Sequence, residues 1–181
     1  LAAPAPGVRV GDLSGIAAAT APGWLRPFGF PPPEIARIAD WTEKMARLAD
    51  AAATADLRSI SGTPSWLLLF FDELVRRHPG RGARLVDFFS GLELVVHGGV
   101  NFAPYRPRFA EWLAGGDAEL REVYPASEGF IAAADRGPGE GLRVVADHGI
   151  FYEFVPVEEI AAARPRRHWL GDVETGVDYA I

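Results

Sequence analysis

Apolar side chains recur every three or four residues in two stretches of the first half of the chain. The first stretch predicts a helix from Glu34 to Ala53 with a single packing face. The second predicts a helix from Ser65 to His78, with Pro64 as its first helical residue. Because this second stretch is apolar almost all round, we expect the helix to be buried on most of its sides.

Shorter apolar runs alternate with further helical patterns. The run Leu92–Val96 is almost continuously apolar, which is typical of a strand inside a parallel sheet. Strands are also predicted at Asp56–Ile60 and Ala118–Tyr124, and helices at Ala83–Phe89 and Pro104–Leu113. Strand, helix, strand, helix, strand is the order of parallel pairing with right-handed crossovers, so the predicted fold class is α/β.

Beyond the third strand the pattern changes to short strands. They are expected at Phe130–Ala134, Leu142–Ala146 and Ile150–Val155. The last two would be joined by Asp147-His148-Gly149, a three-residue loop with a glycine where a left-handed residue is needed. This part therefore adds a short antiparallel hairpin region to the parallel strands.

Proline is frequent at the beginning of the chain. Residues 1–33 contain Phe30-Pro-Pro-Pro33 and similar breakers, so they are predicted to be a Pro-rich entry segment, followed by a single α/β domain over residues 34–181. The chain begins with Leu1, its one methionine is Met45, and Val177–Ile181 resembles a strand that has only begun. We therefore expect a piece of a longer polypeptide, in which the α/β domain belongs to a larger one.

Composition limits the kinds of function. The 181 residues include no cysteine, which excludes disulfides and thiolate metal sites and favours a cytoplasmic protein. A formal net charge of −6 argues against a nucleic-acid surface. The longest apolar run, Trp66–Phe71, is too short to span a membrane, and Lys44 is the one lysine that a Schiff base or a phosphate loop could use.

Three polar or glycine-rich segments follow the three predicted parallel strands. They are Ser61-Gly-Thr63, His97-Gly-Gly99 and Tyr124–Glu128. Because ligands of open α/β sheets bind at the carboxyl edge of the strands, we expect the three segments to form one site. Glycines in the second segment would let a flat ligand approach the backbone closely, although a simple turn explains them equally well.

The third segment carries the most distinctive side chains. Glu128 could hold Mg²⁺ through its carboxylate while the Ser127 hydroxyl binds a phosphate. The first segment lacks the second glycine and the lysine of a phosphate loop, and a helix start before Pro64 explains it better. The four histidines have no zinc-ligand spacing, and no Gly-x-Ser-x-Gly sequence indicates a serine hydrolase.

Four ordered motifs carry a family resemblance: RSISGTPSW (58–66), LELVVHGGVNFAPYR (92–106), EVYPASEGF (122–130) and HGIFYEFVPVEE (148–159). Together with GDLSGI (11–16) and FGFPPP (28–33), they resemble the bacterial branch of the Gretchen Hagen 3 family, the auxin-responsive acyl acid amido synthetases. That family is similar in fold to adenylate-forming enzymes. The resemblance implies a fragment of the large domain of an adenylate-forming enzyme, whose other site motifs lie in the remaining parts of the parent chain.

The resemblance also implies an activity and a set of site residues. The parent enzyme would use ATP and Mg²⁺ to adenylate a carboxylic acid, and would then transfer the acyl group to the amine of an amino acid. Tyr124 and Ala126 would contact the nucleotide, with Tyr124 against adenine, while Ser127 would bind the α-phosphate and Glu128 would hold Mg²⁺. The segment His97-Gly98-Gly99-Val100 would line the adenine and acyl pockets.

Three alternatives remain open at this stage. The parent could transfer the activated acyl group to CoA or another acceptor. The chain could be a non-catalytic α/β interaction module. A metal-dependent hydrolase using Glu128 with Asp135 or Asp147 is the third alternative, and no ligand cluster accompanies these acids in the sequence.

Overall fold

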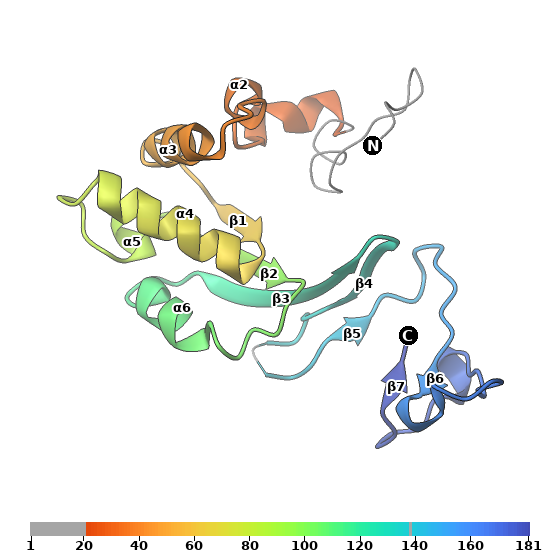
Figure 1. Cartoon of the computed structure of the whole chain (residues 1–181). Coiled ribbons are helices and arrows are strands. Elements are labelled where there is room, and N and C mark those ends of the chain that lie inside the picture. Colours follow the sequence, from red (N-terminus) through yellow and green to blue (C-terminus); the bar gives the residue numbers. More distant parts are fainter. Residues whose placement is uncertain (1–20, 138) are drawn as a thin grey trace. The chain divides into compact units, whose positions relative to one another are not determined.

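The chain divides into two compact units, residues 1–144 and residues 145–181. The computed structural model describes residues 21–137 and 139–181, so most of the Pro-rich entry segment lies outside the described residues (Figure 1). Its described part includes the 3₁₀ helix η1, Gly23–Phe28. The single α/β domain over residues 34–181 stays a prediction, because two compact units can belong to one larger domain.

A five-stranded sheet in the order β1-β2-β3-β4-β5 organises the first unit (Figure 1). Its strands are β1 (Ser59–Gly62), β2 (Leu94–Gly98), β3 (Glu119–Ala126), β4 (Gly129–Ala133) and β5 (Arg143–Val144). The first three strands are parallel, and the last two join them antiparallel. The structure thus confirms the predicted α/β class, with helical crossovers between parallel strands and an antiparallel extension.

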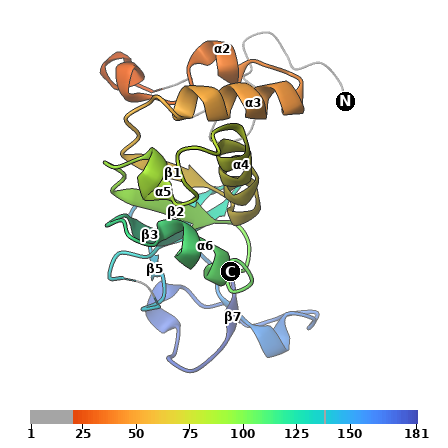
Figure 2. The same cartoon turned by 90° about the vertical axis from the view of Figure 1, so that its left-hand side faces the viewer.

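Helices α4 (Pro64–Arg77) and α6 (Arg106–Leu113) make the two crossovers. The parallel strands follow one another in a single direction across the sheet, so right-handed crossovers place both helices on the same face. Figures 1 and 2 show these helices beside the parallel strands, with the short helix α5 (Leu85–Phe88) near the end of α6. The sequence predicted all three helices at nearly these positions.

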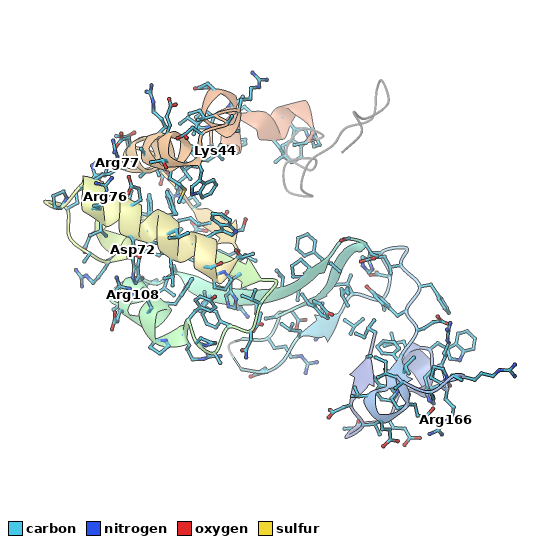
Figure 3. All side chains as sticks on the ribbon, in the orientation of Figure 1. Lys44, Asp72, Arg76, Arg77, Arg108 and Arg166 are labelled. Atoms are coloured by element: carbon cyan, nitrogen blue, oxygen red, sulfur yellow. The ribbon has the colours of Figure 1, made fainter. Side chains whose placement is uncertain are left out.

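Aromatic side chains make the contact between the two crossover helices. Phe71 of α4 is fully buried, and its ring centroid lies 4.6 Å from that of Trp112 and 6.2 Å from that of Phe109. At the outer surface Arg108 of α6 bonds the Asp72 carboxylate of α4 at 3.3 Å (Figure 3). The helices therefore hold each other in place over the sheet, which fixes the strand ends.

The helix predicted from Glu34 to Ala53 is wrong as a single element. The chain forms α2 (Pro33–Ala36) and α3 (Trp41–Ala52), separated by four residues. The Asp40 side chain explains the break, because its carboxylate accepts a hydrogen bond from the backbone N–H of Glu43 at 2.7 Å and so starts a new helix. The sequence did not reveal the break, because apolar residues keep their three- and four-residue spacing across it.

Helix α4 is also less buried than its apolar sequence predicts. Its buried residues lie on one face and include Leu67, Phe71 and Leu74, whereas Trp66 and Leu69 are about half exposed. The expectation of burial on most sides is therefore wrong for the described chain. With 14 residues, α4 is the longest described helix, and no described helix combines the length and apolar character needed to cross a membrane.

The second unit pairs two very short strands, β6 (Val155–Pro156) and β7 (Tyr179–Ala180). It also contains the 3₁₀ helices η2 (Val157–Glu159) and η3 (Leu170–Asp172). The predicted hairpin around Asp147–Gly149 is wrong, because β5 pairs with β4 and β6 pairs with β7. A glycine-containing turn is compatible with a hairpin, but pairing is decided by partners distant in the sequence.

Candidate functional site

The carboxyl ends of the three parallel strands meet at one edge, as predicted. Gly62 of β1 is in register with His97 of β2, and Gly98 is in register with Val123 of β3. A β-carbon placed on Gly99 would lie 3.6 Å from the Thr63 side chain and 3.9 Å from the Pro125 ring. The three sequence segments therefore touch one another in the folded chain.

Gly98 marks the closest approach between two of these segments. A β-carbon at this position would lie 2.1 Å from the Val123 carbonyl oxygen and 3.1 Å from Pro125 Cδ. Atoms cannot approach so closely without moving the backbone of β3. Glycine is therefore required here for β2 and β3 to pair up to the edge.

Residues 124–130 form a hairpin, and the third strand, predicted to end at Tyr124, is two residues longer than expected. β3 continues through Ala126, Ser127 and Glu128 make a two-residue turn, and β4 begins at Gly129. The register shifts between Tyr124 and Pro125, which is a β-bulge. The turn therefore extends beyond the ends of β1 and β2, and the bulge re-aims the strand beside them.

The predicted ligand-binding side chains are accessible at this edge. Tyr124 is 45% exposed and Val100 is 44% exposed, although both are large apolar residues. Ser127 and Glu128 are exposed at the turn, and Ala126 is half-buried. The arrangement offers an aromatic face, a hydroxyl and a carboxylate on one short hairpin next to a glycine backbone.

His97 occupies a different environment from the other predicted site residues. Its side chain is only 3% exposed, and its ring is stacked on Phe102 with the centroids 3.8 Å apart. It lies beneath the segment that leads into α6. The side chain of His97, a predicted site residue, therefore belongs to the interior.

Burial also controls the protonation of His97. Desolvation, followed by the nearby positive charge of Arg106, lowers the pKa of His97 to about 4. In the unfolded chain a histidine has a pKa of about 6.5, so between these values the unfolded state binds more protons than the folded state. The contribution of the neutral His97 to the free energy of unfolding is therefore fully present above about pH 6.5, and it is lost as the pH falls toward 4.

We expect this titration to be visible in unfolding experiments. The free energy of unfolding should fall by an amount on the order of 2 kcal/mol between pH 6.5 and pH 4 because of His97 alone. Urea unfolding at a series of pH values measures how steeply the free energy of unfolding changes with pH. The variant His97→Gln should show a smaller change over the same pH range. An equal slope in the wild type and the variant would contradict the buried, neutral imidazole.

Thr63 belongs to the first of the three segments, which the sequence explained as a helix start. It precedes Pro64 at the start of α4, as expected of a helix N-cap, but its side chain makes no capping hydrogen bond. Its buried hydroxyl oxygen has no hydrogen-bond partner in the described part of the chain. Because it lies next to Gly99 at the N-terminus of a helix, the hydroxyl is placed where an anionic group is favoured.

Glu128 is the carboxylate that the sequence predicted as a Mg²⁺ ligand at this edge. Among the described residues, no three His, Asp or Glu side chains gather in a way that could hold a metal ion. Asp135, one of the acids considered for a hydrolase, is paired with Arg143 at 2.8 Å. A single carboxylate suits Mg²⁺ shared with a nucleotide, which supplies the other oxygens, better than it suits a hydrolase that needs several protein ligands.

The fold and its edge define an α/β protein with a candidate ligand site at the carboxyl ends of parallel strands. No protein-family model matches the chain, and no curated protein matches it. Among solved structures, it is similar to an open conformation of 2-hydroxyisobutyryl-CoA ligase in complex with 2-HIB-AMP and CoA. The sequence identity is 20%, the TM-score is 0.49, and the match covers 65% of this chain. The match covers 26% of the length of that ligase, so the chain spans about a quarter of it.

Proposed function

We propose that this chain is part of an enzyme that activates a carboxylic acid by transferring adenylate to it from ATP. The observation that carries the proposal is the meeting of Gly98-Gly99, Tyr124 and the Ser127–Glu128 turn at one sheet edge. These residues belong to two of the motifs that resemble the Gretchen Hagen 3 family. Their position at one sheet edge supports the proposal.

Each group suits one part of a nucleotide. The exposed Tyr124 ring offers a face for adenine. Gly99 carries no side chain, so a flat base could approach the backbone closely there. The hydroxyls of Ser127 and Thr63 are donors for phosphate oxygens. Glu128 would hold Mg²⁺, which would neutralise charge on the phosphates when bound.

The reaction needs positioning more than proton transfer. A carboxylate oxygen attacks the α-phosphorus of ATP, the bond to the bridging oxygen breaks, and pyrophosphate leaves with the electron pair. The attacking acid is already ionised at neutral pH, so no general base is required. The residues of this edge therefore act by holding the nucleotide and by donating hydrogen bonds where negative charge develops.

The proposal also includes the molecule that accepts the acyl group. Within the Gretchen Hagen 3 resemblance it is the amine of an amino acid, and the alternative is CoA or another acceptor. The full-length parent would carry out turnover, because the remaining motifs are expected in other parts of its chain. The carboxylic acid, the acceptor and those parts of the chain are the partners that we propose.

Pyrophosphate release tests the activity directly. The full-length protein that contains this chain should release pyrophosphate from ATP when Mg²⁺ and the right member of a carboxylic acid panel are present. Adding amino acids or CoA in separate reactions identifies the acceptor by the accelerated release of AMP. If no acid causes release and the protein does not bind ATP, the non-catalytic interaction module is the better account.

A further inference from the structure

Strand β1 forms one edge of the five-stranded sheet, because β2 is the only described strand that pairs with it. The Arg58 carbonyl oxygen accepts hydrogen bonds from the backbone N–H groups of Glu93 and Leu94, so the backbone at Arg58 points toward β2. Successive residues of a parallel strand direct their backbone groups to opposite sides. The N–H and C=O groups of Ser59 and Ser61 therefore point away from β2, toward the outside of the sheet.

This edge lacks the charges, prolines and bulges that often protect a free strand from pairing. Its sequence, Ser59-Ile-Ser-Gly62, has no charged residue and no proline, and its register with β2 is unbroken. The opposite edge of the sheet is different, because β5 is two residues long and its Arg143 pairs with Asp135 at 2.8 Å. The β1 edge is therefore suited to pairing with another strand.

A groove of about 850 Å³ lies beside β1 in the first unit. Residues 55–62 line it without interruption, so β1 and the chain that leads into it form one wall. The other walls come from α3, from the first half of α4 and from residues 27–31. Figures 1 and 2 show β1 as the strand of the parallel sheet that lies nearest to α3. The groove therefore follows the edge that no described strand covers.

Apolar side chains cover the walls of this groove opposite β1. Trp41 and Trp66 contact each other with their ring centroids 4.4 Å apart, and each side chain is about half exposed. Met45, Leu67 and Phe70 also line the groove, and they are buried. Exposed apolar surface that is contiguous in this way marks a contact surface. An occupant of the groove therefore needs apolar side chains as well as backbone groups for β1.

We infer that the outer edge of β1 pairs with a further strand of the same polypeptide, from outside these 181 residues. Ser59 and Ser61 would exchange backbone hydrogen bonds with that strand, and apolar side chains at every second position of it would lie against Trp41 and Trp66. The inference rests on the proposed function, which makes this chain a part of a longer protein. A strand of the same polypeptide is favoured over a transient partner, because an unprotected apolar edge promotes aggregation and needs a permanent cover.

Hydrogen exchange at single backbone amides of the full-length protein tests the inference. The amides of Ile60 and Gly62 point toward β2 and provide the internal reference. If a further strand covers the edge, the amides of Ser59 and Ser61 should exchange within about tenfold of this reference, because all four are then hydrogen-bonded in one sheet. Faster exchange than this at Ser59 and Ser61 would overturn the inference.

Photo-crosslinking identifies the added strand and its source. Trp66 is replaced by p-benzoylphenylalanine in the full-length protein, which should then form a crosslink within one molecule to a segment outside these 181 residues. That segment should carry apolar residues at every second position. The same replacement of Leu69 is the matched control, because Leu69 is 52% exposed on the same helix and does not line the groove.

Three results of the crosslinking would overturn the inference. They are a crosslink to a second molecule, which would indicate pairing between copies, the absence of any crosslink to a segment outside these 181 residues, and equal crosslinking from Leu69 to the same segment. Circular dichroism of each variant confirms that the replacement has not unfolded the protein.

The two proposals fail separately. Fast exchange at Ser59 and Ser61 with normal acid-dependent pyrophosphate release would contradict the added strand alone. Slow exchange and the expected crosslink, without pyrophosphate release for any acid, would contradict adenylation alone.

Discussion

Replacing Glu128 with alanine in the full-length protein is expected to abolish Mg²⁺-dependent adenylation. Glu128 is exposed on the two-residue turn between β3 and β4, and it is the one carboxylate of that turn. Losing the proposed metal ligand would remove charge stabilisation when pyrophosphate leaves, so we expect the rate to fall about 100-fold or more. Pyrophosphate release at saturating ATP and several Mg²⁺ concentrations measures the loss.

The fold of the Glu128→Ala variant should be unaffected. An exposed turn carboxylate contributes little to stability, so the free energy of unfolding should stay within about 0.5 kcal/mol of the wild type. Asp117→Ala is a matched control, because Asp117 is an exposed acid just before β3, at the opposite end of the same strand. Wild-type activity in Glu128→Ala, or an equal loss in Asp117→Ala, would show that Glu128 does not have the assigned role.

Gly98→Ala should have the largest effect on stability of any substitution at the candidate site. The added methyl group would lie 2.1 Å from the Val123 carbonyl oxygen and 3.0 Å from Val123 Cγ2, so β2 and β3 must separate at the edge. Overpacking against backbone in a paired sheet should lower the free energy of unfolding by about 3 kcal/mol. Urea unfolding measures the change.

A second glycine provides the comparison for Gly98. A β-carbon at Gly80 would meet no heavy atom within 4 Å, so Gly80→Ala should leave stability nearly unchanged. Because the Gly98→Ala clash also moves the hairpin that carries Tyr124, ATP affinity should fall in that variant and not in Gly80→Ala. A Gly98→Ala variant as stable as the wild type would disprove the close approach of the two strands.

The sequence predicted the parallel part of the fold well because its signals are local and repeated. Helix α4 begins at Pro64 as expected, and the apolar run Leu92–Val96 corresponds closely to β2. Once strands and helices alternate, the strands are expected to pair in parallel, and parallel strands have their carboxyl ends at one edge of the sheet. The shared edge of Thr63, Gly99 and Pro125 could therefore be predicted without coordinates.

Other features depend on contacts that local patterns do not contain. The break before α3 depends on whether Asp40 bonds the backbone of Glu43 or points into solvent, and periodicity is the same in both cases. The pairing of β5 with β4 depends on a partner chosen across a long loop. Local turn chemistry at Gly149 gave no information about that partner.

The environment of His97 shows what the sequence could and could not supply. Alternation along β2 places His97 on the same face as the buried Val95, which is a signal that its side chain lies inside. The stacking of Phe102 on its ring requires the path of the chain after β2. That contact appears only when separate elements are brought together.

Transfer of ¹⁸O from a labelled carboxylic acid tests the proposed adenylation most directly. The acid, with both carboxylate oxygens labelled, is incubated with ATP, Mg²⁺, an acceptor and the full-length protein, and the products are analysed by mass spectrometry. Attack of the carboxylate on the α-phosphorus predicts one ¹⁸O atom in AMP and none in pyrophosphate. Label in inorganic phosphate, or AMP without label, would contradict an acyl adenylate and the function proposed for this site.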